Sequence, residues 1–240
     1  MQQTIQGIIL QNIKYQDKKN ILKIYTLQHG LQSYAVHIGR SASSKIKPAL
    51  VQPLNQIEFI EYTRKTREVQ KITEMHVTYI YQRLFSDLNK NCVATFINEV
   101  LIKGLKEQHE NRDLYFFVSA KLKELDSEGK NSPDFHLHFL IELAGHLGFY
   151  PNNNYSEKNC LFDLQEGIFT NAVPDHPYYI DSETSFEFNK LISANLNAET
   201  ALYKSGIRSE LLKTLLLFYR LHIPNFGEVK SVQVLKEVLM

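Results

Sequence analysis

The sequence predicts an α+β protein, with an N-terminal β-barrel of the OB-fold type followed by an α-helical domain that contains a loop-rich insertion. Three observations support this. Residues 1–62 alternate β-branched and polar residues, apolar residues from about 66 onward recur at helical spacing, and residues 151–185 are rich in turn formers. We therefore expect a barrel domain at residues 1–65 and a helical domain at residues 66–240.

The first 62 residues contain four or five short strands. The runs TIQGIILQNIKY and NILKIYTLQ alternate, and His29-Gly30 is a turn signal before the third run, LQSYAVHIG. The segment ALVQPLNQIEFIEYT provides one or two more strands, with Pro48 and Pro53 restricting where pairing continues. This count fits a five-stranded barrel of the OB type, although periodicity alone does not separate it from an SH3-like barrel.

The spacing predicts that helices begin at about residue 66. The segment TREVQKITEMHVTYIYQRLFSDL places Ile72 and Met75 at helical spacing, with Thr66 as a candidate N-cap. Further apolar helices follow, and SFEFNKLISANL, GIRSELLKTLLLFYRLHI and VKSVQVLKEVL are the last of them. Between the earlier helices and these last three, residues 151–185 form an irregular insertion, with one hairpin expected around Gly167.

The formal net charge of +1 hides an asymmetry along the chain. Residues 1–71 hold eight Lys and three Arg against one Asp and three Glu, a balance of +7, whereas residues 72–240 carry −6. Such a split favours a basic binding surface near the N-terminus, although a surplus of lysines is equally expected of a solvated face.

The sequence shows no disulfide framework, because it has only two cysteines. It also shows no signal peptide and no apolar run of the roughly 20 residues that span a bilayer. We therefore expect a soluble, cytoplasmic protein with no membrane partner.

Motifs for catalysis are absent from the sequence, including the phosphate-binding loop, the dinucleotide fingerprint and H-E-x-x-H. His136 and His138 are two residues apart and point away from each other on a helix. Cys160 and His176 lie in the insertion, but a structural zinc site needs four ligands. We expect no enzyme activity, no cofactor and no bound metal. The competing class is a metal-dependent hydrolase, with candidate groups Asp134, His136, His138, His146 and Asp175.

A basic stretch, HIGRSASSKIKPALVQP, covers residues 37–53 and contains no acid. Phosphate contacts need Lys, Arg and small donors without nearby carboxylates, so this stretch suits the backbone of a nucleic acid. Tyr25 and Tyr34 would extend the candidate surface, because aromatic rings on a barrel face stack on unpaired bases, and the alternative is that both rings belong to the core. The candidate nucleic-acid-binding residues are Lys14, Lys23, Arg40, Ser43, Ser44, Lys45, Lys47 and, on a late helix, Arg208 and Lys213.

Several segments resemble, in order, the bacterial RecO recombination mediators. GIILQNIKYQDKKNILKIYTLQHGLQSYAVHIGR and SSKIKPALVQPLNQIEF are similar to that family's opening strands, its T-x-x-x-G hairpin (here Thr26 to Gly30) and its basic loop. FINEVLIKGLKEQHENRDLYFFV, FLIELAGHLGFYPN and IPNFGEVKSVQVLKEVL resemble its later helices. Together these pieces cover almost the full chain.

The resemblance implies an OB-fold that binds single- and double-stranded DNA and anneals complementary strands in DNA repair at the nucleoid. It implies that the partner RecR helps this protein to load the RecA recombinase onto DNA coated by single-strand-binding protein (SSB), without catalytic turnover. It also implies that the helical body binds the acidic tail of SSB. The matching residues are His138, Phe139 and Leu143, and His138 stands where some relatives have Arg.

One departure from the family concerns zinc. Many members carry a four-cysteine knuckle where this chain keeps only Cys160, so the chain resembles a zinc-free branch whose insertion is held by packing. The residues expected to pack there are Phe162, Ile168, Phe169, Tyr178 and Tyr179. A generic OB-fold nucleic-acid-binding adaptor without a recombination role is the alternative function.

Overall fold

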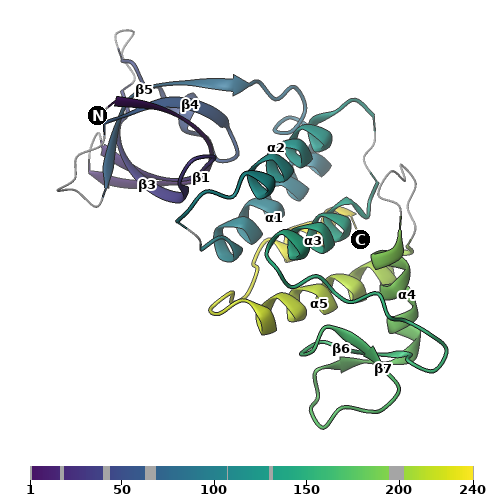
Figure 1. The fold of residues 1–240 in the computed structure, drawn as a ribbon. Helices are drawn as coiled ribbons and strands as arrows, with labels where there is room; N and C mark the ends of the chain where they lie inside the picture. The colour runs from purple at the N-terminus through teal and green to yellow at the C-terminus, as the bar shows by residue number, and fades with distance from the viewer. Residues whose placement is uncertain are drawn as a thin grey trace. The chain divides into compact units, whose positions relative to one another are not determined.

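The computed structural model describes residues 2–16, 19–39, 44–62, 69–106, 108–129, 132–194 and 203–239. The chain forms two compact units, residues 1–127 and residues 128–240. Within the described residues, the first unit holds a β-barrel and two α-helices, and the second holds four α-helices and a small β-sheet (Figure 1).

Five strands form a closed barrel in the first unit. They are β1 (Gln2–Gln16), β2 (Lys19–Thr26), β3 (Gly30–His37), β4 (Gln56–Tyr62) and β5 (Gln70–Tyr79). The hydrogen-bonded order is β1-β2-β3-β5-β4, and β4 closes the barrel by pairing with β1. This arrangement is that of an OB-fold, so the predicted fold class is confirmed.

Strand β1 is long because it pairs with two strands in turn. Its first half pairs with β4 and its second half pairs with β2, and a register shift lies between Ile9 and Gln11. Gly7 belongs to both ladders, opposite Thr26 and Ile57. A Cβ at Gly7 would lie 2.4 Å from Ile24 Cγ2, so a side chain does not fit where the two ladders meet.

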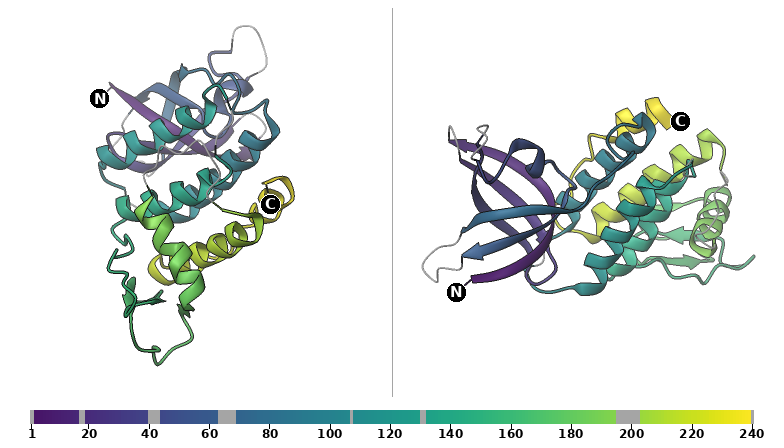
Figure 2. Two further views of the ribbon diagram at one scale, coloured as in Figure 1. Left: turned by 90° about the vertical axis from the view of Figure 1, so that its right-hand side faces the viewer. Right: turned by 90° about the horizontal axis from the view of Figure 1, so that it is seen from above.

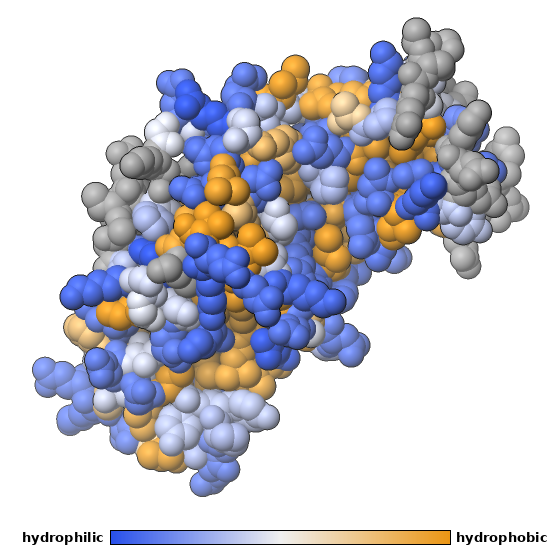
Figure 3. All heavy atoms as spheres, turned by 180° about the vertical axis from the view of Figure 1, so that it is seen from behind, coloured by the Kyte–Doolittle hydropathy of each residue, from blue (hydrophilic) through white to orange (hydrophobic). Residues whose placement is uncertain are grey.

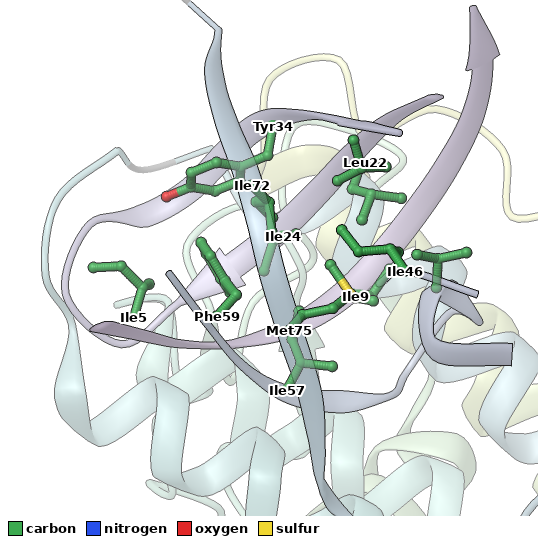
Figure 4. Packing of buried hydrophobic residues seen from close by; sticks show 12 residues of the cluster. Ile5, Ile9, Leu22, Ile24, Tyr34, Ile46, Ile57, Phe59, Ile72 and Met75 are labelled. Carbon is green, nitrogen blue, oxygen red and sulfur yellow. The ribbon is translucent and has the colours of Figure 1, made fainter. Parts of the chain in front are cut away.

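Inward-facing side chains from all five strands fill the barrel (Figure 4). Tyr34 and Phe59 meet edge to face within this core, with ring centroids 4.9 Å apart. The connection between β3 and β4 adds Ile46 and, from the short 3₁₀-helix η1 (Pro48–Val51), Val51. The other members of this core are Ile5, Ile9, Leu22, Ile24, Val36, Ile57, Ile72 and Met75.

The expected helix from residue 66 is wrong, because residues 70–79 form strand β5; Thr66 itself lies outside the described residues. The error has a physical cause. Pairing with β4 skips Thr73, a bulge that leaves the inward-facing Ile72 and Met75 three residues apart. That interval imitates the spacing of a helix. The barrel therefore extends past the expected boundary at residue 65, to Tyr79.

Two helices, α1 (Leu88–Gly104) and α2 (Arg112–Asp126), pack on one side of the barrel (Figure 2). The Asn98 amide of α1 donates to the carbonyl of Leu10 at 3.2 Å, and the Ser119 hydroxyl of α2 donates to Gln56 Oε1 at 2.7 Å. These helices were expected in a separate helical domain, but they belong to the same compact unit as the barrel.

The carboxylate of Asp126 joins the end of α2 to the segment that leaves β5. It accepts hydrogen bonds from the backbone N–H groups of Gln82, Arg83 and Leu84 and from the Tyr79 hydroxyl. Burial alone would raise the pKa of Asp126, but these donors lower it below its ordinary value. The carboxylate therefore stays ionised, and it holds residues 82–84 against the end of α2.

The second unit contains α3 (Phe135–His146), α4 (Ser182–Ser193), α5 (Ser205–His222) and α6 (Val232–Leu239). Its sheet consists of β6 (Leu161–Asp163), β7 (Ile168–Thr170) and β8 (Tyr179–Ile180), in the order β7-β6-β8. The hairpin expected around Gly167 is confirmed, and Gly167 has φ of 68°. None of the helices in the described ranges is long and apolar enough to cross a membrane.

Aromatic packing holds the insertion against the helices. Phe162 and Phe169 are buried, and the Phe162 ring lies 4.7 Å from that of Phe188 on α4 and 6.0 Å from that of Phe218 on α5. Of the residues expected to pack there, Ile168 and Tyr178 are instead each 38% exposed, and Tyr179 is half-buried.

The Gly7→Ala substitution tests whether the barrel requires a glycine at the position where β1 pairs with both β2 and β4. The added methyl group overlaps Ile24, and we expect the free energy of unfolding to fall by about 1–3 kcal/mol. Urea unfolding followed by circular dichroism measures this loss. Gly206→Ala is the control, because nothing lies within 4 Å of a Cβ at that position. Equal stability of the two variants would contradict the steric argument.

Candidate nucleic-acid interface

The connection after β3 carries the predicted basic loop. Its two ends are joined by a hydrogen bond from Gly39 N to Ile46 O at 3.1 Å, and the Ile46 side chain is buried in the barrel. Lys45 and Lys47 flank Ile46 in sequence, and both are exposed. The loop thus presents two cationic side chains on either side of a residue, Ile46, that is anchored in the barrel core. Arg40 and Ser43 lie outside the described residues, and Ser44 is half-buried.

Lys45 has a partner that the sequence did not indicate. Its ammonium group forms an ion pair with the Glu74 carboxylate of β5. The two side chains are 68% and 51% exposed, and such surface pairs contribute roughly 0–1 kcal/mol. A phosphate that binds Lys45 would therefore displace the Glu74 carboxylate. The free energy lost by breaking this ion pair would be small.

This ion pair crosses the least paired junction of the barrel, which we call the β3–β5 seam. The two strands pair in parallel through only two residue pairs, Tyr34 with Gln70 and Ala35 with Lys71. The basic loop lies beside this seam, because Lys45 reaches Glu74 farther along β5.

Strand lysines occur on β1 and β2. Lys23 lies on the outer face of the barrel, whereas Lys14 lies opposite Asn20, on the face of β2 that carries Leu22. Lys23 is half-buried opposite Gln11 and Ser33, and Lys14 is exposed near the end of β1. Two further exposed lysines belong to this region and were not singled out from the sequence. Lys19 lies opposite His37, and Lys71 lies opposite Ala35. The alternation of Lys19, Ile21 and Lys23 was the signal for the first of them.

Charge divides the barrel into two sides. The described residues of β1, β2 and β3 include no Asp or Glu, whereas β4 carries Glu58 and Glu61 and β5 carries Glu74. Glu58 Oε1 lies 3.5 Å from His76 Nε2, and both residues line a surface pocket together with Glu74 and Thr4. A polyanion is therefore favoured on β1–β3 and near Lys71 of β5, and disfavoured beside the exposed or half-buried Glu58 and Glu74.

Tyr25 and Tyr34 do not contribute to an exposed surface, so the expectation that they stack on bases is wrong. Tyr25 is 2% exposed beneath Tyr115 of α2, and Tyr34 is 1% exposed in the barrel core. Burial, with a further contribution from Glu61, raises the pKa of Tyr34 far above its ordinary value. Both rings face other side chains, which sequence alternation alone did not reveal.

Arg208 was expected to contact DNA, and the structure corrects this. Its Nε donates to Asp134 Oδ1 at 2.7 Å, and its two terminal nitrogens donate to the carbonyls of Tyr203 and Leu239. Arg208 is 5% exposed and Asp134 is fully buried. The guanidinium joins the starts of α3 and α5, so it is not available to a phosphate. Lys213 on α5 is 59% exposed and pairs with Glu210 at 2.9 Å.

The residues expected to bind the SSB tail lie inside the second unit. Phe139 is 1% exposed, Leu143 is fully buried and His138 is 9% exposed. All three belong to α3, which is apolar around most of its circumference. They cannot form a docking surface without unpacking this helix, so the prediction of these three residues is wrong.

The described part of the chain has no group of three or more His, Cys, Asp or Glu residues placed to hold a metal ion. Burial, with smaller contributions from Arg208 and His138, lowers the pKa of His136 to about 3. This histidine is therefore a neutral core residue at physiological pH. In the insertion, His176 Nε2 lies 3.3 Å from Asp163 Oδ2.

Comparison with known proteins gives matches over nearly the whole chain. The family model "Recombination protein O N terminal" matches residues 1–81, and "Recombination protein O C terminal" matches residues 85–231. Proteins named "DNA repair protein RecO" are similar throughout. That of Phocaeicola vulgatus is 34% identical over 99% of both chains, that of Flavobacterium psychrophilum is 33% identical over 99% of both, and that of Azobacteroides pseudotrichonymphae is 30% identical over 97% of both.

The Arg208→Ala substitution distinguishes a structural arginine from a DNA contact. It leaves the buried Asp134 carboxylate without its main partner, and we expect a loss of about 3–5 kcal/mol in the free energy of unfolding. Lys213→Ala is the matched control on the same helix, and we expect a change below about 0.5 kcal/mol. Urea unfolding measures both. Equal effects of the two substitutions would contradict the assignment of Arg208 to the core.

Proposed function

Because the chain belongs to the RecO family of DNA repair proteins, we propose that it binds single- and double-stranded DNA through its N-terminal barrel and anneals complementary strands. The single observation that carries this proposal is the acid-free outer face of β1–β3, with exposed lysines and the basic loop beside it. Family membership supports the nature of the ligand.

The proposed binding is to the phosphate backbone and does not read sequence. The residues assigned to it are Lys14, Lys19, Lys23, Lys45, Lys47 and Lys71, and Arg40, Ser43 and Ser44 complete the loop. Lysine is a point charge on a flexible stem, so it follows a backbone of variable shape. Lys213 is a further candidate on the second unit, because it is exposed.

Annealing follows from the same electrostatics. Two strands repel each other through their phosphates, and a cationic surface that contacts only phosphates lowers this repulsion and leaves the base edges free to pair. The proposed function therefore requires binding and positioning of DNA, and it requires no covalent step.

We further propose that the protein acts at the nucleoid with RecR and helps RecA to replace SSB on single-stranded DNA. The basis of this step is membership of the family that the sequence resembles. A contact with the acidic SSB tail would use exposed residues, because His138, Phe139 and Leu143 are buried.

An annealing assay tests the proposed function. Complementary oligonucleotides, bare or coated with SSB, are mixed with the protein at two salt concentrations, and duplex formation is followed by fluorescence transfer. We expect faster annealing of both substrates, with the larger effect at low salt. Acceleration of bare strands only would indicate the generic adaptor function. No binding to either form of DNA would contradict the proposal itself.

The double substitution Lys45→Glu/Lys47→Glu tests the role of the basic loop. The logarithm of DNA affinity falls linearly with the logarithm of salt concentration, by about 0.7–0.9 for each neutralised phosphate. We expect the variant to bind more weakly and its slope to be smaller by about 1.4–1.8. Fluorescence anisotropy of labelled DNA measures both quantities.

Lys158→Glu/Lys190→Glu is the matched control for this experiment. It makes the same change in charge at two exposed lysines of the second unit. An unchanged salt slope in the loop variant, or an equal decrease in the control, would remove Lys45 and Lys47 from the interface.

A further inference from the structure

Tyr15 is the most exposed aromatic side chain among the described residues, at 66%. It lies near the end of β1, where the pairing with β2 shifts from Lys14 opposite Asn20 to Gln16 opposite Lys19. Tyr15 is the extra residue of this bulge and has no cross-strand partner. Bulges frequently turn a side chain out of the ladder, and here the bulge places a phenol ring in solvent.

Apolar side chains continue from Tyr15 across the outer face of the barrel. Ile13 is 40% exposed and lies opposite the half-buried Ile21, which in turn lies opposite Ala35. Cross-strand partners share one face of a sheet, so these residues form a continuous row. We call Ile13, Tyr15 and Ile21 the apolar strip.

Lysines border the apolar strip. Lys19 and Lys23 lie two residues to either side of Ile21 on β2, and Lys71 follows Ala35 in the same cross-strand row. In the described residues, the two strands that carry the strip, β1 and β2, contribute no carboxylate. An apolar surface with a ring at one end and cations beside it matches a ligand with flat apolar faces and a charged backbone.

Exposure alone would not distinguish this strip from ordinary surface. Apolar residues lie among hydrophilic ones over the face seen in Figure 3, as on most proteins. Other exposed rings have other surroundings, however. Phe186 on α4 is 45% exposed but has Lys190 Nζ over its face at 4.2 Å and Glu187 as its neighbour. By contrast, the described residues of β1 and β2, the two strands that carry the strip, include lysines and no carboxylate.

We infer that Tyr15 stacks on an unpaired base and that the apolar strip gives the barrel a preference for single-stranded over double-stranded DNA. The inference rests on the proposed function and names the residue that distinguishes the two substrates. Single strands expose base faces, which stack on aromatic rings whatever their sequence. In a duplex these faces are covered by neighbouring base pairs, so only the lysines find a partner. Tyr15 is thus a specificity determinant, and the lysines bind both forms of DNA.

The Tyr15→Ala substitution tests this inference by comparison of two ligands. We expect affinity for oligo(dT) to fall by about 5- to 140-fold, the range for loss of one stacked base, and affinity for a duplex of equal length to change less than two-fold. Tyr15→Phe should retain the wild-type ratio, because it keeps the ring. Phe116→Ala removes a 52% exposed ring on α2 and is the matched control. The unchanged duplex affinity also verifies that the variant is folded.

The absence of tryptophan from the chain provides a second, direct readout. Tyr15→Trp introduces a single indole, whose fluorescence should be quenched by oligo(dT) and little affected by duplex DNA. Phe116→Trp should respond to neither ligand.

Two outcomes would overturn the inference, and a third concerns the proposed function. If the wild-type protein binds DNA but Tyr15→Ala leaves the ratio of single-strand to duplex affinity unchanged, Tyr15 does not select single strands. If the indole of Tyr15→Trp responds to a protein partner and not to oligo(dT), the strip is a protein contact. If the wild-type protein binds neither form of DNA, the proposed function itself fails.

Discussion

The barrel depends on one strand, β1, having a partner on each side. Because its first half pairs with β4 and its second half with β2, the sheet closes and β1–β3 become one contiguous arc. The remaining arc, β4 and β5, carries the acids of the strands in the described residues. Closure at Gly7 therefore does more than complete a core. In the described residues, it also places the three strands without carboxylates on one side of the barrel and the two strands with carboxylates on the other.

This separation explains why the overall charge is a poor guide to the protein. Residues 1–127 hold 18 Lys and Arg against 12 Asp and Glu, and residues 128–240 hold 9 against 14, so the two units carry +6 and −5. Within the described residues of the first unit, the acids lie on β4 and β5, on the helices and just before the helices, and none lies on β1, β2 or β3. A polyanion responds to the local field near a surface, because at physiological salt distant charges are screened within about 8 Å.

Local patterns in the sequence were sufficient for most of the fold. Strands β1 to β4 follow from alternation, and the hairpin at Gly167 follows from its turn residues. Strand β5 was missed because its bulge moved Met75 into helical register with Ile72. The site was harder to predict because its errors come from contacts between distant residues. Nothing near Arg208 in sequence reveals Asp134, and nothing near Lys45 reveals Glu74. The positions of Lys47 and Lys23 could be predicted without knowing a distant partner. Lys47 is exposed and Lys23 is half-buried, as expected.

The ion pair between Lys45 and Glu74 also has a kinetic meaning. If a phosphate takes the place of Glu74 at Lys45, departure of the DNA need not leave a bare cation, since the carboxylate returns from β5 as the phosphate leaves. Dissociation then becomes a substitution between two anions, with a lower barrier than simple separation of charges. With the proposed annealing activity, the protein has to release its product, because the phosphates of the finished duplex still bind the lysines. A carboxylate within reach of the basic loop would allow the same molecule to act repeatedly without an external source of energy.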